Sequence, residues 1–199
     1  MNAERKQAGW GFWLQWLLAS AIGLVVGGFL ALPIGFGVGD AVENALGKMA
    51  GYIISGALFG ALLGAGLGIM QSLALRTRLA GAGWWAPAST AAGAVGLAIS
   101  LPIFVSANVA EAVSGIVAGA SLGISIGIGQ WLVLRRQVVQ ASWWVLASGV
   151  GLAISMAVGF PLGGEGRELI ALSVTGVMAG ALTGIPLVWL LRQAVPAAR

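Results

Sequence analysis

Long apolar runs alternate with short polar segments along the whole chain. Six such runs contain no charged side chain, and they cover residues 13–36, 49–75, 84–105, 112–134, 143–162 and 169–191. Each has roughly the 20 residues that a helix needs to cross the hydrocarbon core of a bilayer. The pattern predicts an all-α integral membrane protein, with six transmembrane helices in a single domain (residues 1–199). The longest connection, residues 37–48, overlaps the glycine-rich string GFGVGD and is predicted to be a flexible outer loop.

The apolar runs belong to an internal repeat. Residues 66–89 read GLGIMQSLALRTRLAGAGWWAPAS and align without a gap on residues 125–148, SIGIGQWLVLRRQVVQASWWVLAS, at an offset of 59. The first span fits the same pattern at an offset of 69, and the last span fits it at an offset of 57. Internal repeats of this length indicate a recurring supersecondary unit. The repeat predicts three pseudo-equivalent helical hairpins, roughly at residues 1–78, 79–137 and 138–199.

The odd-numbered spans share landmarks at both ends. Tryptophans stand near the start of each, where indole rings favour the headgroup region of a bilayer. The predicted interfacial anchors are Trp16, Trp84, Trp85, Trp143 and Trp144. The alternative role for these rings is a cage around a ligand. A proline 17 residues further on is predicted to end or bend each odd span, because it lacks an amide hydrogen; these prolines are Pro33, Pro102 and Pro161.

The even-numbered spans carry glycine at every fourth position. A spacing of four places the glycines along one helix face, which lets a neighbouring backbone approach closely. The predicted packing glycines are Gly56, Gly60, Gly64 and Gly68, then Gly115, Gly119, Gly123 and Gly127, and finally Gly176, Gly180 and Gly184. These stripes are expected to face other helices of the same chain, or alternatively a second copy or another membrane protein.

A few polar residues lie near the ends of the spans that adjoin the basic segments. Gln71, Gln130, Ser89 and Ser148 could hydrogen-bond between helices or line a polar path. The third repeat has Leu187 in the glutamine position, directly after Pro186, so three equivalent glutamines cannot form a ring. This irregularity is the best pointer in the sequence to a functional site.

Composition and charge support the membrane assignment and add an orientation. Hydrophobic residues make up 59% of the chain, charged residues make up 8%, and the mean hydropathy is +0.97. On one side of the predicted membrane the basic residues are Arg5, Lys6, Arg76, Arg78, Arg135, Arg136, Arg192 and Arg199, and on the other they are Lys48 and Arg167. The positive-inside rule then predicts that both termini lie in the cytoplasm. The net charge of +4 does not indicate nucleic-acid binding, because the basic residues form no patch on a soluble surface.

The sequence offers little to a catalytic interpretation. Histidine and cysteine are absent, which removes the usual general base and the common ligands of transition metals and haem. Two G-x-S-x-G strings, at 119–123 and 123–127, lack the histidine and the strand-to-helix turn of a nucleophile elbow. No ionisable residue lies inside a span, which argues against a transporter driven by protons or sodium ions. No catalytic, cofactor-binding or metal-binding residue is predicted.

Two resemblances accompany these patterns. The hairpin with G-x-x-Q-W-x-V-L-R-R followed by W-W-V-L-A-S resembles a repeat of small multi-span bacterial membrane proteins with no known activity. The likeness covers residues 66–89 and 125–148 well. The layout of three hairpins is similar in outline to a bacterial acid-resistance membrane protein family. Both likenesses imply the cytoplasmic (inner) membrane of a bacterium, and neither implies an activity for this chain.

The leading functional hypothesis is a non-catalytic scaffold or subunit that acts through helix packing. Its expected partners are the lipid bilayer and either another membrane protein or a second copy of the chain. The alternative is a passive channel, or a protein that binds a small solute, with a path lined by the glutamines and serines named above.

Overall fold

The computed structural model describes residues 9–107 and 110–193. Six α-helices account for most of them: α1 (Trp10–Leu46), α2 (Lys48–Leu75), α3 (Trp85–Ala107), α4 (Glu111–Leu134), α5 (Trp143–Gly159) and α6 (Glu168–Arg192). Two short 3₁₀ helices, η1 (Ala82–Trp84) and η2 (Phe160–Leu162), precede α3 and follow α5. The described residues contain no strand. Six of these helical segments are long and apolar enough to cross a membrane, which confirms the predicted all-α, six-span class.

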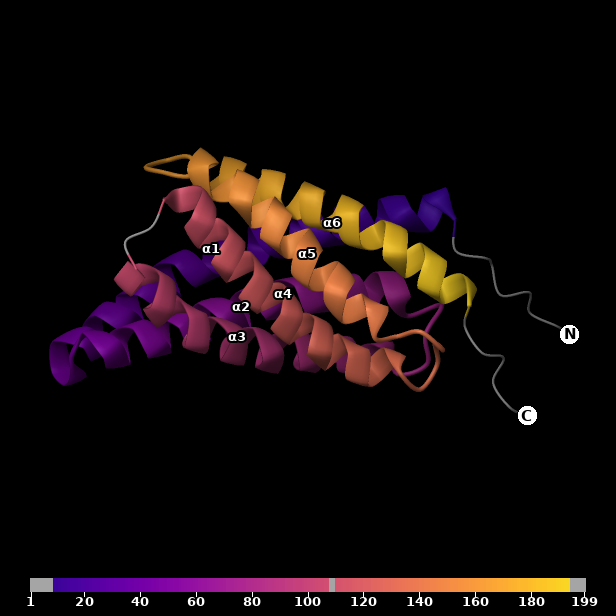
Figure 1. The fold of residues 1–199 in the computed structure, drawn as a ribbon, viewed down its shortest axis with the longest axis horizontal. Helices are drawn as coiled ribbons and strands as arrows, with labels where there is room; N and C mark the ends of the chain where they lie inside the picture. Colours follow the sequence, from indigo (N-terminus) through magenta and orange to yellow (C-terminus); the bar gives the residue numbers. More distant parts are fainter. Residues whose placement is uncertain (1–8, 108–109, 194–199) are drawn as a thin grey trace, which may run out of the picture.

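The six helices run alongside one another (Figure 1), and their contacts close into a ring. Each helix packs against the next one along the chain, and α6 returns to pack against α1. Hydrophobic side chains fill the inside of this ring, and every one of the six helices also exposes large hydrophobic side chains. An apolar exterior is what a helix bundle presents to lipid.

The glycine stripes lie at the contacts between α2 and α3, α4 and α5, and α6 and α1. A methyl group on Gly60 would overlap the backbone of Gly93 in α3, and one on Gly119 would overlap Leu152 in α5. A methyl group on Gly180 would lie 2.7 Å from the Cα atom of Leu17 in α1. The other predicted packing glycines are buried in the same three contacts: Gly56, Gly64, Gly68, Gly115, Gly123, Gly127, Gly176 and Gly184. All eleven therefore face helices of their own chain.

The predicted outer loop at residues 37–48 is wrong. Helix α1 continues to Leu46, and Gly47 alone separates it from α2. Gly35 and Gly39 are buried against α2, and the Ser55 hydroxyl donates to the carbonyl of Gly35 over 3.1 Å. The turn itself uses the positive φ of Gly47, 91°, which glycine adopts without strain. Close packing on α2 therefore keeps this glycine-rich segment helical.

The three prolines also differ from one another. Pro33 lies inside α1 and Pro102 inside α3, so neither ends its helix, which was the first of the two outcomes predicted for them. Pro161 stands in η2, directly after α5 has ended, as predicted. A proline inside a helix removes one hydrogen bond. In α1 the packing against α2 extends well beyond Pro33, so the helix continues past it.

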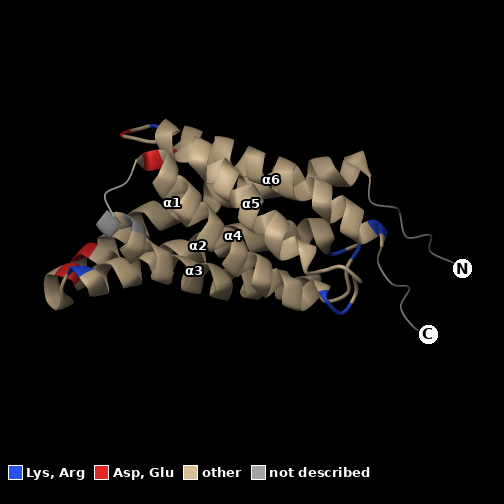
Figure 2. Cartoon of the chain, in the orientation of Figure 1, with Lys and Arg blue, Asp and Glu red and all other residues tan. Residues whose placement is uncertain are grey.

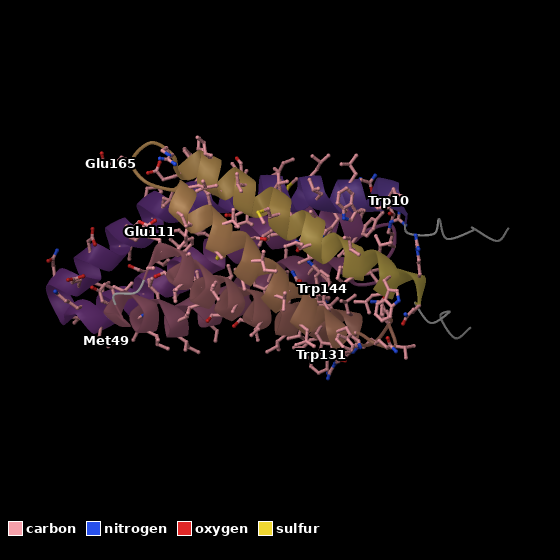
Figure 3. All side chains as sticks on the ribbon, turned by 45° about the horizontal axis from the view of Figure 1, so that its top comes forward. Trp10, Met49, Glu111, Trp131, Trp144 and Glu165 are labelled. Carbon is pink, nitrogen blue, oxygen red and sulfur yellow. The ribbon has the colours of Figure 1, made fainter. Side chains whose placement is uncertain are left out.

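Charged residues gather at the two ends of the bundle (Figure 2). One end holds the start of α1, the end of α6 and the connections at 76–84 and 135–142, with their arginines. Figure 3 shows Glu111, Glu165 and Met49 at the opposite end from Trp10, Trp131 and Trp144. The two ends are called the basic end and the acidic end below.

Candidate functional site

Three tryptophans from the odd-numbered helices meet at the centre of the bundle near its basic end. Trp16 of α1, Trp85 of α3 and Trp144 of α5 are at most 1% exposed. Their ring centroids lie 6.1 Å apart for Trp16 and Trp85, 5.7 Å for Trp16 and Trp144, and 6.0 Å for Trp85 and Trp144. Two of the three pairs are edge-to-face, an arrangement worth about 0.5–1.5 kcal/mol beyond the area buried. We call these residues the tryptophan triad.

Two glutamines from even-numbered helices hold two members of the triad in place. Trp85 Nε1 donates to Gln71 Oε1 over 3.0 Å, and Trp144 Nε1 donates to Gln130 Oε1 over 2.8 Å. Each pair is separated by 14 residues in the chain. The two amides also meet, since Gln130 Nε2 donates to Gln71 Oε1 over 3.1 Å. The indole hydrogens, which are costly to bury unpaired, are thereby satisfied.

The same amides reach back to serines of the preceding odd helices. Gln71 Nε2 donates to Ser20 Oγ of α1 over 3.0 Å, and Gln130 Nε2 donates to Ser89 Oγ of α3 over 2.8 Å. One glutamine side chain therefore bridges the odd helix before it and the odd helix after it. This bridge occurs twice, on two glutamines that are 59 residues apart.

The third position of this pattern is built differently. Leu187 of α6 is fully buried in the same cluster and has no amide to offer. Trp16 Nε1 instead donates to Thr183 Oγ1, one helical turn earlier in α6, over 3.0 Å. Ser148, the counterpart of Ser20 and Ser89, is 2% exposed, and its hydroxyl has no partner among the described residues.

The tryptophans divide into two groups by exposure. Trp84 and Trp143 are 71% and 56% exposed on the outside of the bundle, where interfacial anchors would lie. Trp16, Trp85 and Trp144 are buried, which differs from the expectation that all five tryptophans line the bilayer interface. Their indole hydrogens find partners on α6, α2 and α4, so the centre of the bundle accommodates their polar edge as well as their apolar area.

Three of the four residues considered for a polar path bond to one another. Gln71, Gln130, Ser89 and Ser148 are all buried, and the first three belong to one hydrogen-bonded network. The network contains amides, hydroxyls and indoles and no charged group. Among the described residues there is also no group of three or more acidic side chains that could hold a metal. The chemistry available at the centre is therefore neutral hydrogen bonding.

Sequence reasoning missed the role of Thr183 and the direct contact between tryptophans. The constant spacing of 14 from each glutamine to a tryptophan was the available signal, because it marks Trp85 and Trp144 rather than their neighbours Trp84 and Trp143. Nothing in the sequence paired Trp16 with Thr183, which are 167 residues apart.

Comparison with known proteins gives no match for this chain among protein families, curated proteins or solved structures.

Proposed function

We propose that the chain is an integral protein of a bacterial cytoplasmic membrane that acts as a non-catalytic scaffold or as a subunit of a larger assembly. In this proposal its three pseudo-equivalent hairpins form one rigid unit with both termini in the cytoplasm. Glycine-mediated packing holds the unit together, and its apolar outer surface is left for lipid and for other membrane proteins.

One observation carries the proposal: the polar side chains at the centre are occupied with one another. Gln71 and Gln130 bond to each other, to two tryptophans and to two serines. A group that already has its partners inside a packed core gains little from a solute, because binding would exchange one set of hydrogen bonds for another. Such a network favours a rigid, packed centre over a path for solutes.

The contacts also support three equivalent units. Each glycine stripe faces the next odd-numbered helix, and each glutamine donates to the odd helix before it and accepts from the one after it. The third contact of this kind joins α6 to α1. Here Trp16 donates to Thr183, because α6 has no glutamine at the equivalent position. These contacts support a repeat in which each even helix packs on the next odd helix, so that neighbouring hairpins are joined across the borders read from the sequence.

Mass determination of the protein extracted from its native membrane in mild detergent tests the proposal. We expect a complex heavier than the 20.0 kDa chain, with a second copy or another membrane protein in fixed stoichiometry. Recovery of the 20.0 kDa chain alone at membrane concentrations, with no partner after gentle cross-linking in the intact membrane, contradicts it.

The alternative, passive transport or binding of a small solute, has one observation in its favour. Ser148 carries a buried hydroxyl that has no partner among the described residues, and a solute or water could supply one. Single cysteines in place of Ser89 and Ser148 distinguish the two functions in membrane vesicles. A closed bundle predicts that a small water-soluble thiol reagent modifies neither, whereas it modifies the exposed control Thr77→Cys. Rapid modification of both buried positions supports a path.

A further inference from the structure

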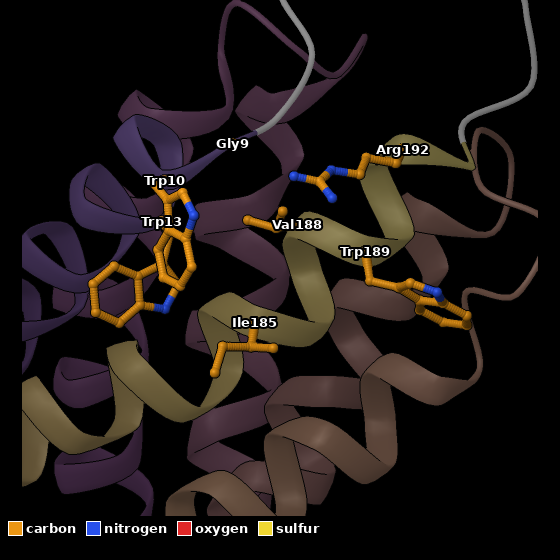
Figure 4. A pocket seen from close by; sticks show the side chains of 7 residues that line it. All are labelled: Gly9, Trp10, Trp13, Ile185, Val188, Trp189 and Arg192. Atoms are coloured by element: carbon orange, nitrogen blue, oxygen red, sulfur yellow. The ribbon is translucent and has the colours of Figure 1, made fainter.

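A second feature of the basic end has no part in the proposed function. A pocket with a volume of about 260 Å³ lies between the start of α1 and the end of α6 (Figure 4). Trp10 and Trp13 of α1 form one wall, and Ile185 and Val188 of α6 form the opposite one. Trp189 and Arg192 complete the α6 side, and Gly9 lies at the edge. We call this pocket the α1–α6 groove.

The groove opens toward the outside of the ring and not toward its centre. Trp10 is 80% exposed and Ile185 is 60% exposed, whereas the neighbouring Trp16 is fully buried. Trp13 is fixed at the base of the groove, because its Nε1 donates to the carbonyl of Ala181 over 3.1 Å. It also stacks edge-to-face with Trp10, with ring centroids 5.7 Å apart. The aromatic wall is therefore held by α6 as well as by α1.

The groove combines apolar walls with positive charge at its rim. Arg192 extends toward α1 above Val188 (Figure 4), and none of the seven lining residues is acidic. Helix α1 begins at this point without a side-chain cap and without an acidic residue in its first turn. The positive end of its dipole adds to the charge of Arg192 at the rim. An anion with an apolar tail complements both parts.

The size and position of the groove favour a lipid over a free small molecule. Small-molecule sites usually measure about 300–1,000 Å³, because they enclose most of the ligand. A volume of about 260 Å³ that opens sideways holds only part of a ligand, the rest of which must lie in the surrounding medium. A phospholipid meets this condition in a bilayer, since its tails remain among other lipids. Indole rings and a guanidinium are also the groups that prefer headgroup depth and phosphate.

We propose that the α1–α6 groove binds one anionic phospholipid, with the headgroup phosphate at Arg192 and an acyl chain along Trp10, Ile185 and Val188. The proposal requires that the chain lies in a membrane, and it does not depend on the scaffold role. Pro186 stands inside α6 between the residues that form the wall, so the irregularity noted in the third repeat adjoins this groove.

Titration of the purified protein with phosphatidylglycerol and with phosphatidylcholine of the same chains, followed by native mass spectrometry, tests the proposal. We expect phosphatidylglycerol to bind more tightly, and Arg192→Gln to weaken it about tenfold, as for the loss of one charge-assisted hydrogen bond. Arg135→Gln is the matched control, because it removes the same charge at the same end from a guanidinium that lies 5.2 Å from the ring centroid of Trp131. Equal weakening by both variants overturns the proposal.

Photocrosslinking of the unmodified protein gives a readout that survives misfolding of a variant. Phosphatidylglycerol with a photoreactive acyl chain should label the start of α1 and the end of α6. Labelling spread evenly over all six helices contradicts a specific site. Complete displacement of the lipid by excess inorganic phosphate also overturns the proposal, because it would identify the ligand as a free anion. None of these results bears on whether the protein has a membrane partner, so the two proposals can fail separately.

Discussion

Ser89 and Ser148 occupy equivalent positions in the sequence repeat, yet their surroundings differ. Ser89 Oγ accepts from Gln130 and donates to the carbonyl of Trp85, whereas Ser148 Oγ has no partner among the described residues. Removing one partner of a buried hydrogen bond strands the other, and removing an unpaired polar group strands nothing.

This contrast gives a paired prediction. Ser89→Ala should lower the free energy of unfolding by about 1–3 kcal/mol, because the Gln130 amide loses one of its two acceptors and keeps only Gln71 Oε1. Ser148→Ala, the matched control, should leave stability unchanged or raise it. Unfolding of both variants in mixed micelles with increasing sodium dodecyl sulfate measures the difference. Equal losses in the two variants would show that Ser148 has a partner that the hydrogen-bond pattern does not include.

Leu187 offers the converse experiment, in which an interaction is added. Leu187→Gln places an amide where the repeat has one, within the pattern that links Gln130 to Ser89 and Trp144. We expect the thermal midpoint in detergent to rise, by an amount that corresponds to about 1 kcal/mol for a new buried hydrogen bond. Leu187→Met controls for the change in shape without adding a donor. A midpoint for the glutamine variant below that of the methionine variant would contradict three equivalent positions.

The burial of single tryptophans was only partly predictable. Trp84 and Trp85 are adjacent, and neighbours in a helix point about 100° apart, so one of the two faces outward when the other faces the centre. The preference of indole rings for the headgroup region assigns both tryptophans to the bilayer interface. The choice depends on Gln71 and Gln130, which accept the hydrogen of the second tryptophan in each pair.

At the scale of helices, the glycine stripes were predictable and their partners were not. A period of four identifies a packing face from the sequence alone. It does not say which neighbour the face meets, because that depends on how the ring closes. The structure directs Gly119 at α5 and Gly180 at α1, so the last stripe meets the first helix.

A single methyl group tests this packing. Gly119→Ala should destabilise the bundle by about 1–3 kcal/mol, because the added carbon overlaps the carbonyl of Leu152. Gly37→Ala in α1 is the control, since nothing lies within 4 Å of the added carbon. That variant should be neutral or gain up to about 1 kcal/mol from helix propensity. Similar unfolding curves for both variants would mean that the helices around Gly119 can separate without cost.

Hydropathy also did not predict the full length of α1. Its 37 residues extend for about 55 Å at about 1.5 Å per residue, well beyond a hydrocarbon core of about 30 Å. A hydropathy window ends the span near Phe36, where polar residues begin. The helix continues because Gly39 and Gly51 let α1 and α2 stay in contact up to the turn. The tip of this hairpin extends past the ends of the other helices at the acidic end (Figure 1).

At the scale of the whole molecule, the fold class followed from composition and the ring did not. Six apolar runs without charges leave a helical membrane bundle as the only class that satisfies the backbone. Closure of α6 on α1 depends on contacts between residues more than 140 apart, such as Trp16 with Thr183 and Gly28 with Leu172, and no local pattern encodes them.

The distribution of charge predicts the orientation of the bundle. Cysteines in place of Thr77 and Gln140, two exposed residues of the basic end, should react only from the cytoplasmic side. Cysteines in place of Asn44 and Glu165, exposed at the acidic end, should react only from the outside. The native chain has no cysteine and gives no background. Gln137 lies at the same end but is unsuited to this test, because its side-chain amide bonds the backbone of Ala80 and a cysteine would remove both bonds. Reaction of the first pair from outside would reverse the orientation.

The contact between α1 and α6 can form only late in synthesis. A ribosome delivers α1 first and α6 last, so Trp16 enters the membrane long before Thr183 exists. Until then the indole hydrogen of Trp16 lacks the Thr183 hydroxyl that accepts it. The face of α1 around Leu17 and Ala21 also lacks the glycines of α6 that pack against it. The nascent protein therefore stays incomplete up to its final helix. We expect a chain that stops short of α6 to leave the indole edge of Trp16 and this face of α1 uncovered, and therefore to be degraded faster than the full chain.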